Sequence, residues 1–223
     1  LPALETATNT YFSIAAGRSV YLLELLSVSG AGAAVDVANG ATFAAPNLVS
    51  VSDATLSIGA GGVLDAPNLT SLTNSTFTRR PDQTFHHGAI TNVNGSELAV
   101  VGGAALDLPS VSSYTNTVDD YRANLTLLSA DGANSLLDLS GAQTLTSASY
   151  AWYGVRYYDV VASNGGAIDL SSVGSIVGAR TDTGDGDDWL RIRTDTGGSI
   201  DLSSLRSLSG RVRFDVNGDG ALN

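Results

Sequence analysis

Aromatic side chains gathered in one part of the chain are the residues best suited to hold a ligand. Five of them fall within nine residues: Tyr150, Trp152, Tyr153, Tyr157 and Tyr158. Trp189, the second tryptophan, lies further along. Flat aromatic rings have apolar faces and polar edges, and the C–H faces of sugar rings stack on them. Because adjacent strand residues point to opposite faces, we expect about half of these rings to be structural.

Arginines near these aromatics can donate hydrogen bonds to sugar hydroxyls or to uronate carboxylates. They are Arg156, Arg180, Arg191 and Arg193. Stacking and hydrogen bonding together predict a carbohydrate-binding surface. The candidate contacts are Tyr114, Tyr121, Tyr150, Trp152, Tyr153, Arg156, Tyr157, Arg180, Trp189 and Arg191.

Carboxylates in the same part of the chain suit calcium, which takes six to eight oxygen ligands. Four of them lie within seven residues, at Asp182, Asp185, Asp187 and Asp188, with glycines between them. Asp119 and Asp120 are weaker candidates for a shared site. A solvated acidic loop is the alternative interpretation. No organic cofactor is expected.

These residues interrupt a repeat that runs through the whole chain. The repeated phrase is VLDAPNLTSLTN from Val63, ALDLPSVSSYTN from Ala105, LLDLSGAQTLTS from Leu136, AIDLSSVGSIVG from Ala167 and SIDLSSLRSLSG from Ser199. Less regular copies place the frame at positions 21, 44, 65, 86, 107, 138, 169 and 201. Such a period predicts a solenoid, in which each repeat stacks on its neighbours.

The last three steps of the frame are longer than the earlier ones by about ten residues, which the alignment places at 114–123, 145–156 and 178–188. Because the coils of a solenoid stack, we expect these excursions to emerge side by side on one edge. Extra loops on one face are commonly the binding face of a repeat protein.

The spacing of apolar residues within each phrase is typical of short strands with one face inward. Helix formers are scarce, since the chain has no Lys, no Met and little Glu. The leucine-rich-repeat pattern is not sustained, and the steps do not fit a left-handed hexapeptide helix. We therefore predict an all-β fold, a right-handed parallel β-helix with 21-residue turns followed by 31-residue turns. About nine turns would make a rod roughly 43 Å long.

The Asp of each phrase has a structural interpretation. Asp followed by Pro or by Ser-Ser is a turn signal, in which the carboxylate accepts a hydrogen bond from the amide two residues on. We expect this role rather than a catalytic or metal-binding ladder. His86 and His87, with Arg79 and Arg80 nearby, are expected in a solvated, irregular turn.

Composition restricts the partners. The net charge is −11, from 11 Arg and 22 acidic residues, which argues against nucleic acid and against anionic membranes. No run of about twenty apolar residues is present to span a bilayer. The absence of Cys fits a bacterial extracellular protein. Because the sequence starts inside a repeat, we expect a processed piece of a larger secreted protein.

The C-terminal segment FDVNGDGALN has Asp215, Asn217 and Asp219 at positions 1, 3 and 5 of an EF-hand-like loop, with Gly220 at position 6. This phrase resembles the first calcium loop of dockerin modules, which occur at the ends of secreted bacterial multi-module proteins, many of them polysaccharide-degrading. The repeat predicts a β-helix domain at 1–213, and the resemblance implies a truncated calcium loop or linker at 214–223. Since the loop's last ligand is missing, we expect any bound Ca²⁺ at Asp182–Asp188.

Three functions remain open from the sequence. The favoured one is a non-catalytic, monomeric carbohydrate-binding module, similar to β-helical modules, that recognises a plant or algal polysaccharide, xylan-like or uronate-containing. Covalently linked catalytic or anchoring modules would complete the parent protein. The second is a polysaccharide lyase or glycoside hydrolase, whose carboxylate pair would lie about 5–10 Å apart. The third is a structural stalk or adhesin segment, which leaves the aromatic excursions unexplained.

Overall fold

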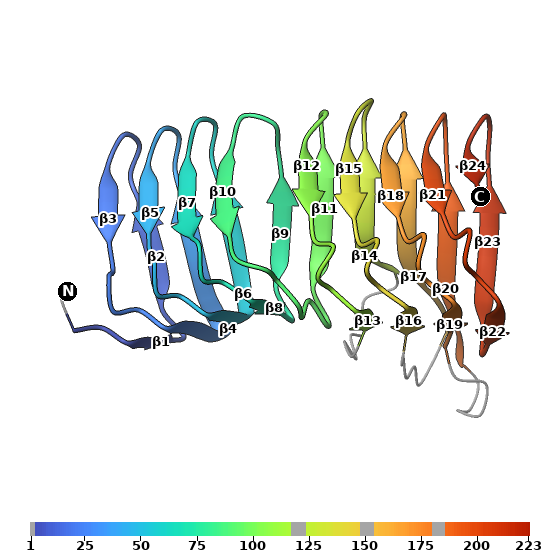
Figure 1. Ribbon diagram of the computed structural model, residues 1–223, viewed down its shortest axis with the longest axis horizontal. Helices are drawn as coiled ribbons and strands as arrows, with labels where there is room; N and C mark the ends of the chain where they lie inside the picture. Colours follow the sequence, from blue (N-terminus) through green and yellow to red (C-terminus); the bar gives the residue numbers. More distant parts are fainter. Residues whose placement is uncertain (1–2, 117–123, 148–153, 180–185) are drawn as a thin grey trace.

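The chain forms an elongated stack of short parallel strands (Figure 1). The computed structural model describes residues 3–116, 124–147, 154–179 and 186–223. All regular elements in these ranges are β-strands, which confirms the predicted all-β class. None of the described residues belongs to a helix long and apolar enough to cross a membrane.

Four sheets make up the walls of the stack. Sheet A runs its whole length in the order β1 (Thr6–Thr8), β4 (Ser27–Val37), β6 (Ser50–Ile58), β9 (Thr76–Arg79), β11 (Glu97–Val101), β14 (Asn124–Asp131), β17 (Gly154–Ser163), β20 (Gly186–Thr194) and β23 (Val212–Val216). Two short strands, β2 (Tyr11–Ile14) and β8 (Ser71–Thr73), pair with β4 and β6.

The other three sheets are shorter. Sheet B contains β10 (Thr84–His87), β7 (Val63–Ala66), β5 (Thr42–Ala44) and β3 (Ser19–Tyr21). Sheet C contains β12 (Ala105–Asp107), β15 (Leu136–Asp138), β18 (Ala167–Asp169), β21 (Ser199–Asp201) and β24 (Ala221–Leu222). Sheet D contains β13 (Ser113–Asn116), β16 (Thr144–Ser147), β19 (Ser175–Val177) and β22 (Ser207–Ser209).

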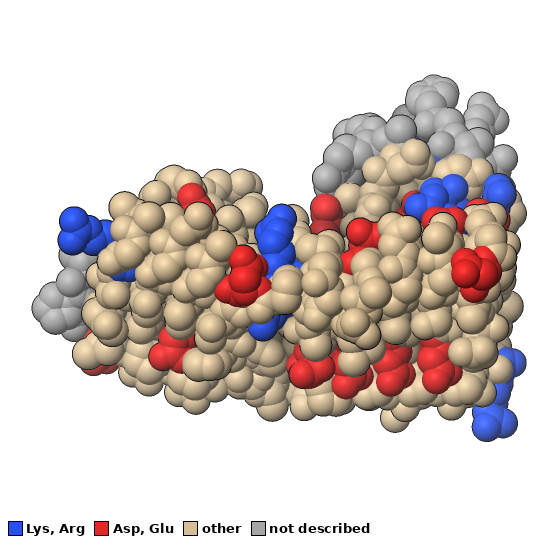
Figure 2. All heavy atoms as spheres, turned by 90° about the horizontal axis from the view of Figure 1, so that it is seen from above, with Lys and Arg blue, Asp and Glu red and all other residues tan. Residues whose placement is uncertain are grey.

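The strand register confirms the repeat frame. In sheet B, Tyr21 pairs with Ala44, Ala44 with Asp65, and Asp65 with His86. In sheet C, the phrase aspartates pair in the order Asp107, Asp138, Asp169 and Asp201. Figure 2 shows acidic residues in a row along the C-terminal half of the molecule. Residues one frame step apart are therefore neighbours on adjacent strands.

Alternating residues of the strands fill the interior. One row of sheet A passes from Leu56 on β6 through Phe77 and Leu98 to Leu128 on β14, and all four side chains are buried. The opposite residues of the same strands form the outer face. This period of two lets each coil contribute one layer to a continuous apolar core.

The turn role predicted for the phrase aspartates is confirmed in three coils. Oδ1 of Asp138 accepts a hydrogen bond of 2.8 Å from the amide of Ser140. Asp169 and Asp201 make the same bond, each at 2.9 Å, to the serine two residues on. Asp65 and Asp107 are followed at that offset by proline, which has no N–H to donate.

The C-terminal segment continues the stack. β23 crosses the boundary predicted between 213 and 214, and β24 pairs with β21, so the structure gives 214–223 no separate unit. The turn NGDG occupies the place of SNGG and DTGG in the two preceding coils. A Cβ on Gly198 would lie 2.2 Å from the carbonyl oxygen of Ala162, and one on Gly220 would lie 2.7 Å from Thr194 Oγ1. Glycine is therefore needed where each turn meets the coil before it.

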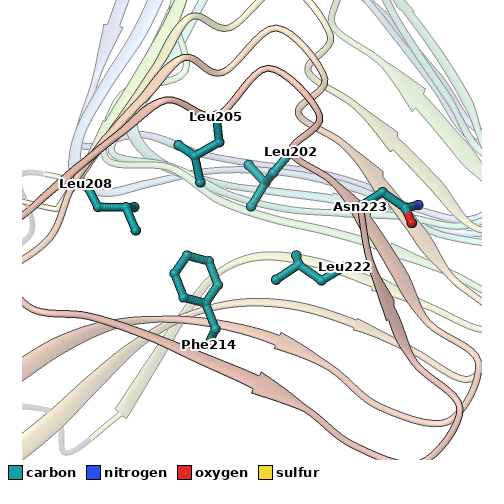
Figure 3. A pocket seen from close by; sticks show the side chains of 6 residues that line it. All are labelled: Leu202, Leu205, Leu208, Phe214, Leu222 and Asn223. Carbon is teal, nitrogen blue, oxygen red and sulfur yellow. The ribbon is translucent and has the colours of Figure 1, made fainter.

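The last coil leaves an apolar hollow of about 280 Å³ at the C-terminal end of the core (Figure 3). Its lining residues are Leu202, Leu205, Leu208, Phe214, Leu222 and Asn223. Phe214 pairs with Ile192 of the coil before it and thus ends a row of core side chains. The hollow is the exposed end of the interior.

Candidate ligand-binding face

The strands that follow the three excursions are neighbours in sheet A. β14 pairs with β17, and β17 pairs with β20 from Gly154–Gly186 onward. Several predicted site residues lie outside the described residues, namely Asp119, Asp120, Tyr121, Tyr150, Trp152, Tyr153, Arg180, Asp182 and Asp185. The described part of the candidate site is therefore the outer face of β17, β20 and β23.

Tyr157 and Tyr158 point to opposite sides of β17, as predicted. Tyr158 is 2% exposed and belongs to the core, whereas Tyr157 is partly exposed on the outer face. Tyr157 pairs with Trp189 on β20, which is also partly exposed. Two aromatic residues thus occupy neighbouring outward positions on adjacent strands.

Three predicted site residues are buried. Tyr114 is fully buried, and its hydroxyl donates a 2.9 Å hydrogen bond to the carbonyl oxygen of Ser96. Arg156 and Asp188 are buried as well and pair with each other in the strand register, one residue before the outward Tyr157 and Trp189. The alternation of strand side chains explains this placement. The ligand contact predicted for Tyr114 is corrected, since its ring is part of the core.

An arginine held by a carboxylate lies next to the aromatic pair. Arg191 donates from Nε and Nη2 to the two carboxylate oxygens of Asp159, at 2.8 and 2.6 Å. Its guanidinium also lies over the ring of Tyr157, 4.2 Å from the centroid. The hydrogen bonds to Asp159 raise the pKa of Arg191. This planar, doubly bonded arrangement fixes the orientation of both charged groups.

A second arginine approaches the same tyrosine from β23. Arg213 donates from Nη1 to the hydroxyl of Tyr157 at 3.3 Å, and from Nε to Asp215 at 2.7 Å. The pair with Asp215 raises the pKa of Arg213. Tyr157 is therefore held by two arginines, and its ring supports Arg191 rather than standing free.

The polar part of the face continues toward the next turn. Arg193 lies 2.9 Å from a carboxylate oxygen of Asp195, and Asn217 donates to the other oxygen of that carboxylate at 2.7 Å. Three arginines thus face three aspartates, so the local charges balance on a chain of net charge −11. Figure 2 shows the basic and acidic side chains interspersed near the C-terminal end.

The predicted calcium ligands are dispersed where they are described. Asp188 is buried, and Asp187 belongs to β20. In the C-terminal segment, Asp215 is bonded by Arg213, and Asp219 is exposed in the turn after β23. Within the described ranges, no three His, Asp or Glu side chains are grouped closely enough to share a metal ion.

The histidines lie in a strand and not in the irregular turn predicted for them. Both belong to β10, which pairs with β7. His86 Nδ1 lies 3.3 Å from Asp65 Oδ1 in an exposed position, and His87 Nδ1 lies 2.7 Å from the carbonyl oxygen of Gly88. Both histidine side chains therefore contact neighbouring residues of the fold.

Asp159, Asp195 and Arg213 are functional candidates that the sequence argument missed. The signal for Asp159 was present, because the last frame step is 32 residues and Asp159 is 32 residues before Arg191. Residues one step apart become neighbours in a stacked fold. Opposite charges at that spacing therefore predict an ion pair across adjacent strands.

Comparison of the chain with protein-family models, with curated proteins and with solved structures gives no match. The class of this protein is therefore described from its fold and its outer face alone. The chain is an all-β protein of stacked parallel strands. Near its C-terminal end, the outer face of sheet A carries an aromatic pair next to fixed, alternating charges.

Proposed function

We propose that this chain is a non-catalytic carbohydrate-binding module that holds an extended plant or algal polysaccharide. The observation that carries the proposal is the order of outward residues on β17 and β20, where Trp189 lies beside Tyr157 and the Asp159–Arg191 pair occupies the next outward position. The partly exposed Trp189, beside donors and acceptors that are already fixed, matches the apolar faces and hydroxyl edges of sugars.

The polar groups of the face are held in place before a ligand binds, and this supports the proposed binding function. Arg191 is already oriented by Asp159 and by the Tyr157 ring, so a ligand would not have to order this long side chain. Ordering such a side chain on binding costs about 0.5–1.5 kcal/mol. Donors held in place before binding therefore favour affinity for a hydroxyl-rich ligand, which forms many weak hydrogen bonds.

Charge balance favours a neutral glycan over a uronate polymer. Among the described residues, Arg191, Arg193 and Arg213 each have an aspartate partner, so this part of the face offers no surplus positive charge to an anionic chain. A xylan-like chain needs hydroxyl partners only. We therefore assign the neutral, xylan-like class to this face.

Binding is favoured over hydrolysis because Asp159 is 5% exposed and both of its oxygens accept from Arg191. A glycosidase needs two carboxylates that reach the scissile bond. In this proposal the module works outside the cell, as a monomer, and covalently linked modules supply catalysis or anchoring. Calcium, if bound, belongs to the acidic segment Asp182–Asp188.

The test measures binding of the intact chain to insoluble xylan and to polygalacturonate, with a reducing-end and unsaturated-product assay on the same samples. We expect binding to xylan without product. Trp189→Ala should weaken binding about thirtyfold, since removing an aromatic anchor costs about 2 kcal/mol. Tyr21→Ala is the control, because that ring is 62% exposed in β3 at the other end (Figure 1).

Two results would contradict the proposal. Product formation above a purification blank would favour the lyase or hydrolase. Absence of binding to every polysaccharide tested would favour a structural stalk.

A further inference from the structure

A second feature of the outer face of sheet A is a shallow groove of about 180 Å³ across β9, β11 and β14. Its outward lining residues are Thr76, Thr78, Glu97, Ala99, Thr126 and Ser129. Small side chains leave the groove open, and hydroxyl groups with one carboxylate provide hydrogen-bonding partners. The groove is therefore polar at its edges and lies on a rigid, hydrogen-bonded sheet.

The strand register places this groove in line with the aromatic and charged face. Thr78 pairs with Ala99, Ala99 with Ser129, and Ser129 with Val161. The same row then reaches Arg193 on β20 and Asp215 on β23.

A second, discontinuous row lies beside the first, because the register of β14 shifts between Thr126 and Leu128. Thr76 pairs with Glu97 in the groove, and Thr126 at its far edge pairs with Asp159. Asp159 then pairs with Arg191, and Arg191 with Arg213. Both rows cross the strands, so the groove and the charged face form one track along the long axis.

We propose that the groove is a second subsite of the polysaccharide-binding face, so that one glycan chain lies across the strands from β9 to β23. This inference rests on the proposed function. Five strand spacings of about 4.8 Å give the track a length of roughly 24 Å. Several consecutive sugar residues are needed to cover that distance, and the ligand is therefore a polymer chain rather than a chain end or a disaccharide.

The chemistry of the groove selects the same ligand class as the charged face. Among the described residues that line the groove, Glu97 is the charged one, and a carboxylate accepts hydrogen bonds from sugar hydroxyls. The same carboxylate repels a uronate chain. Thr76, Thr126 and Ser129 add hydroxyls that both donate and accept. A neutral, hydroxyl-rich glycan fits both halves of the track.

The test blocks the groove with a large side chain introduced on β11, one of the strands that form it. Ala99→Trp places a large side chain in the outward row, and Ala34→Trp makes the same change on β4, in the same sheet but outside the groove. Affinities for xylohexaose and xylobiose are measured by calorimetry, with circular dichroism and melting temperature as the check on folding. Thr78→Trp repeats the test from the neighbouring strand if Ala99→Trp fails to fold.

We expect Ala99→Trp to weaken xylohexaose binding at least tenfold and to leave xylobiose binding unchanged, while Ala34→Trp changes neither. Equal xylohexaose affinity for the folded groove variant and Ala34→Trp would overturn the groove subsite. If that equality occurs while Trp189→Ala still weakens binding about thirtyfold, the proposed function stands and only the groove is wrong. If the unaltered chain binds no glycan, the proposed function itself fails.

Discussion

Arg79, the last residue of β9, is partly exposed, and its Nε donates a 3.2 Å hydrogen bond to the carbonyl oxygen of Ala105 on the next coil. Its strand partner Val100 is a buried core residue. The guanidinium also donates to the carbonyl oxygens of Arg80 and Gln83.

Arg79 lies where two walls of the solenoid become separate sheets. β10 ends sheet B and β12 begins sheet C, although sheet A continues past this point through β9 and β11. Burial lowers the pKa of Arg79, partly offset by the nearby charges of Asp107 and Asp82. The side chain therefore fills a gap in the ladder with hydrogen bonds to carbonyls.

We predict that Arg79→Val destabilises the chain by about 2 kcal/mol. Valine suits the core row, but the substitution leaves three carbonyls without their charged donor, and such bonds contribute about 1.5–3 kcal/mol each before repacking. Urea unfolding measures the change. Arg80→Ala removes an exposed neighbour and should be nearly neutral. A more stable Arg79→Val would show that desolvation of the charge outweighs its hydrogen bonds.

The phrase aspartates give a prediction with an internal control. Asp138→Ala should cost about 1 kcal/mol, because the amide of Ser140 loses its acceptor. Asp107→Ala should cost much less, since Pro109 stands at the matching offset and has no N–H. Thermal and urea unfolding of the two variants are compared under the same conditions. Equal losses would show that the ladder acts through another interaction.

The two ion pairs on the outer face should differ in strength. Asp159→Ala leaves Arg191 without its doubly bonded partner in a site where the side chains are 16% and 7% exposed. We predict a loss of about 3 kcal/mol, since breaking a buried pair leaves an uncompensated charge. Asp215→Ala removes the partner of Arg213, which is 49% exposed, and should cost much less, because solvent screens an exposed pair.

Unfolding in urea measures both variants, and high salt separates them further. Salt screens the exposed Arg213–Asp215 pair more than the covered Arg191–Asp159 pair. Equal losses for the two variants would contradict the greater strength expected of the Arg191–Asp159 pair.

The repeat in the sequence predicted the fold, because the spacing between its copies equals the number of residues in one coil of the stack. Positions such as Asp138 and Asp169 recur at the coil length, and stacking turns that spacing into strand register. At the C-terminus the same reasoning allows two interpretations. DVNGDG matches a calcium loop residue by residue, but its glycines and Asn217 also meet the needs of a solenoid turn, which the two preceding coils already showed.

Side-chain direction was harder to predict than register. Alternation fixed Tyr157 and Tyr158 relative to each other, but which of them faces outward depends on the position of β17 in the stack. Tyr114 was assigned to the ligand because tyrosine suits sugars. The long, continuous core of this fold has room for a whole phenol ring, and Ser96 satisfies its hydroxyl. Composition alone does not distinguish these two environments.

We predict that the hydrogen bonds to Asp131 contribute to the free energy of unfolding in a way that depends on pH in the acid range. Hydrogen bonds from Ser163 and Asn164, each 2.7 Å, lower its pKa below the ordinary value of 3.8, and slight burial opposes the shift. A lowered folded-state pKa stabilises the protein above the unfolded-state value, and this contribution is lost as the pH falls through the folded-state pKa. Ser163→Ala combined with Asn164→Ala should therefore destabilise at pH 6 and lose less stability than the unaltered chain between pH 4 and pH 2.

We predict that the buried Tyr114 makes the stability of the protein fall at alkaline pH. Burial raises the pKa of its phenol above the ordinary value of 10, and the charge of Glu97 adds to the shift. The folded protein therefore keeps the neutral phenol while the unfolded chain begins to ionise near pH 10, so stability falls as the pH rises beyond that value. One proton released only on unfolding gives a slope of about 1.4 kcal/mol per pH unit. Tyr114→Phe should remove that slope.

At neutral pH the same substitution should cost about 1 kcal/mol, because the carbonyl oxygen of Ser96 loses its buried donor. The variant is thus expected to be less stable than the unaltered chain at pH 7 and to approach it above pH 10. Tyr21→Phe, at an exposed position, controls for the general effect of removing a phenol. Urea unfolding at pH 7 and pH 11 measures all three proteins. A Tyr114→Phe curve parallel to that of the unaltered chain across this range would show that Tyr114 ionises as easily folded as unfolded.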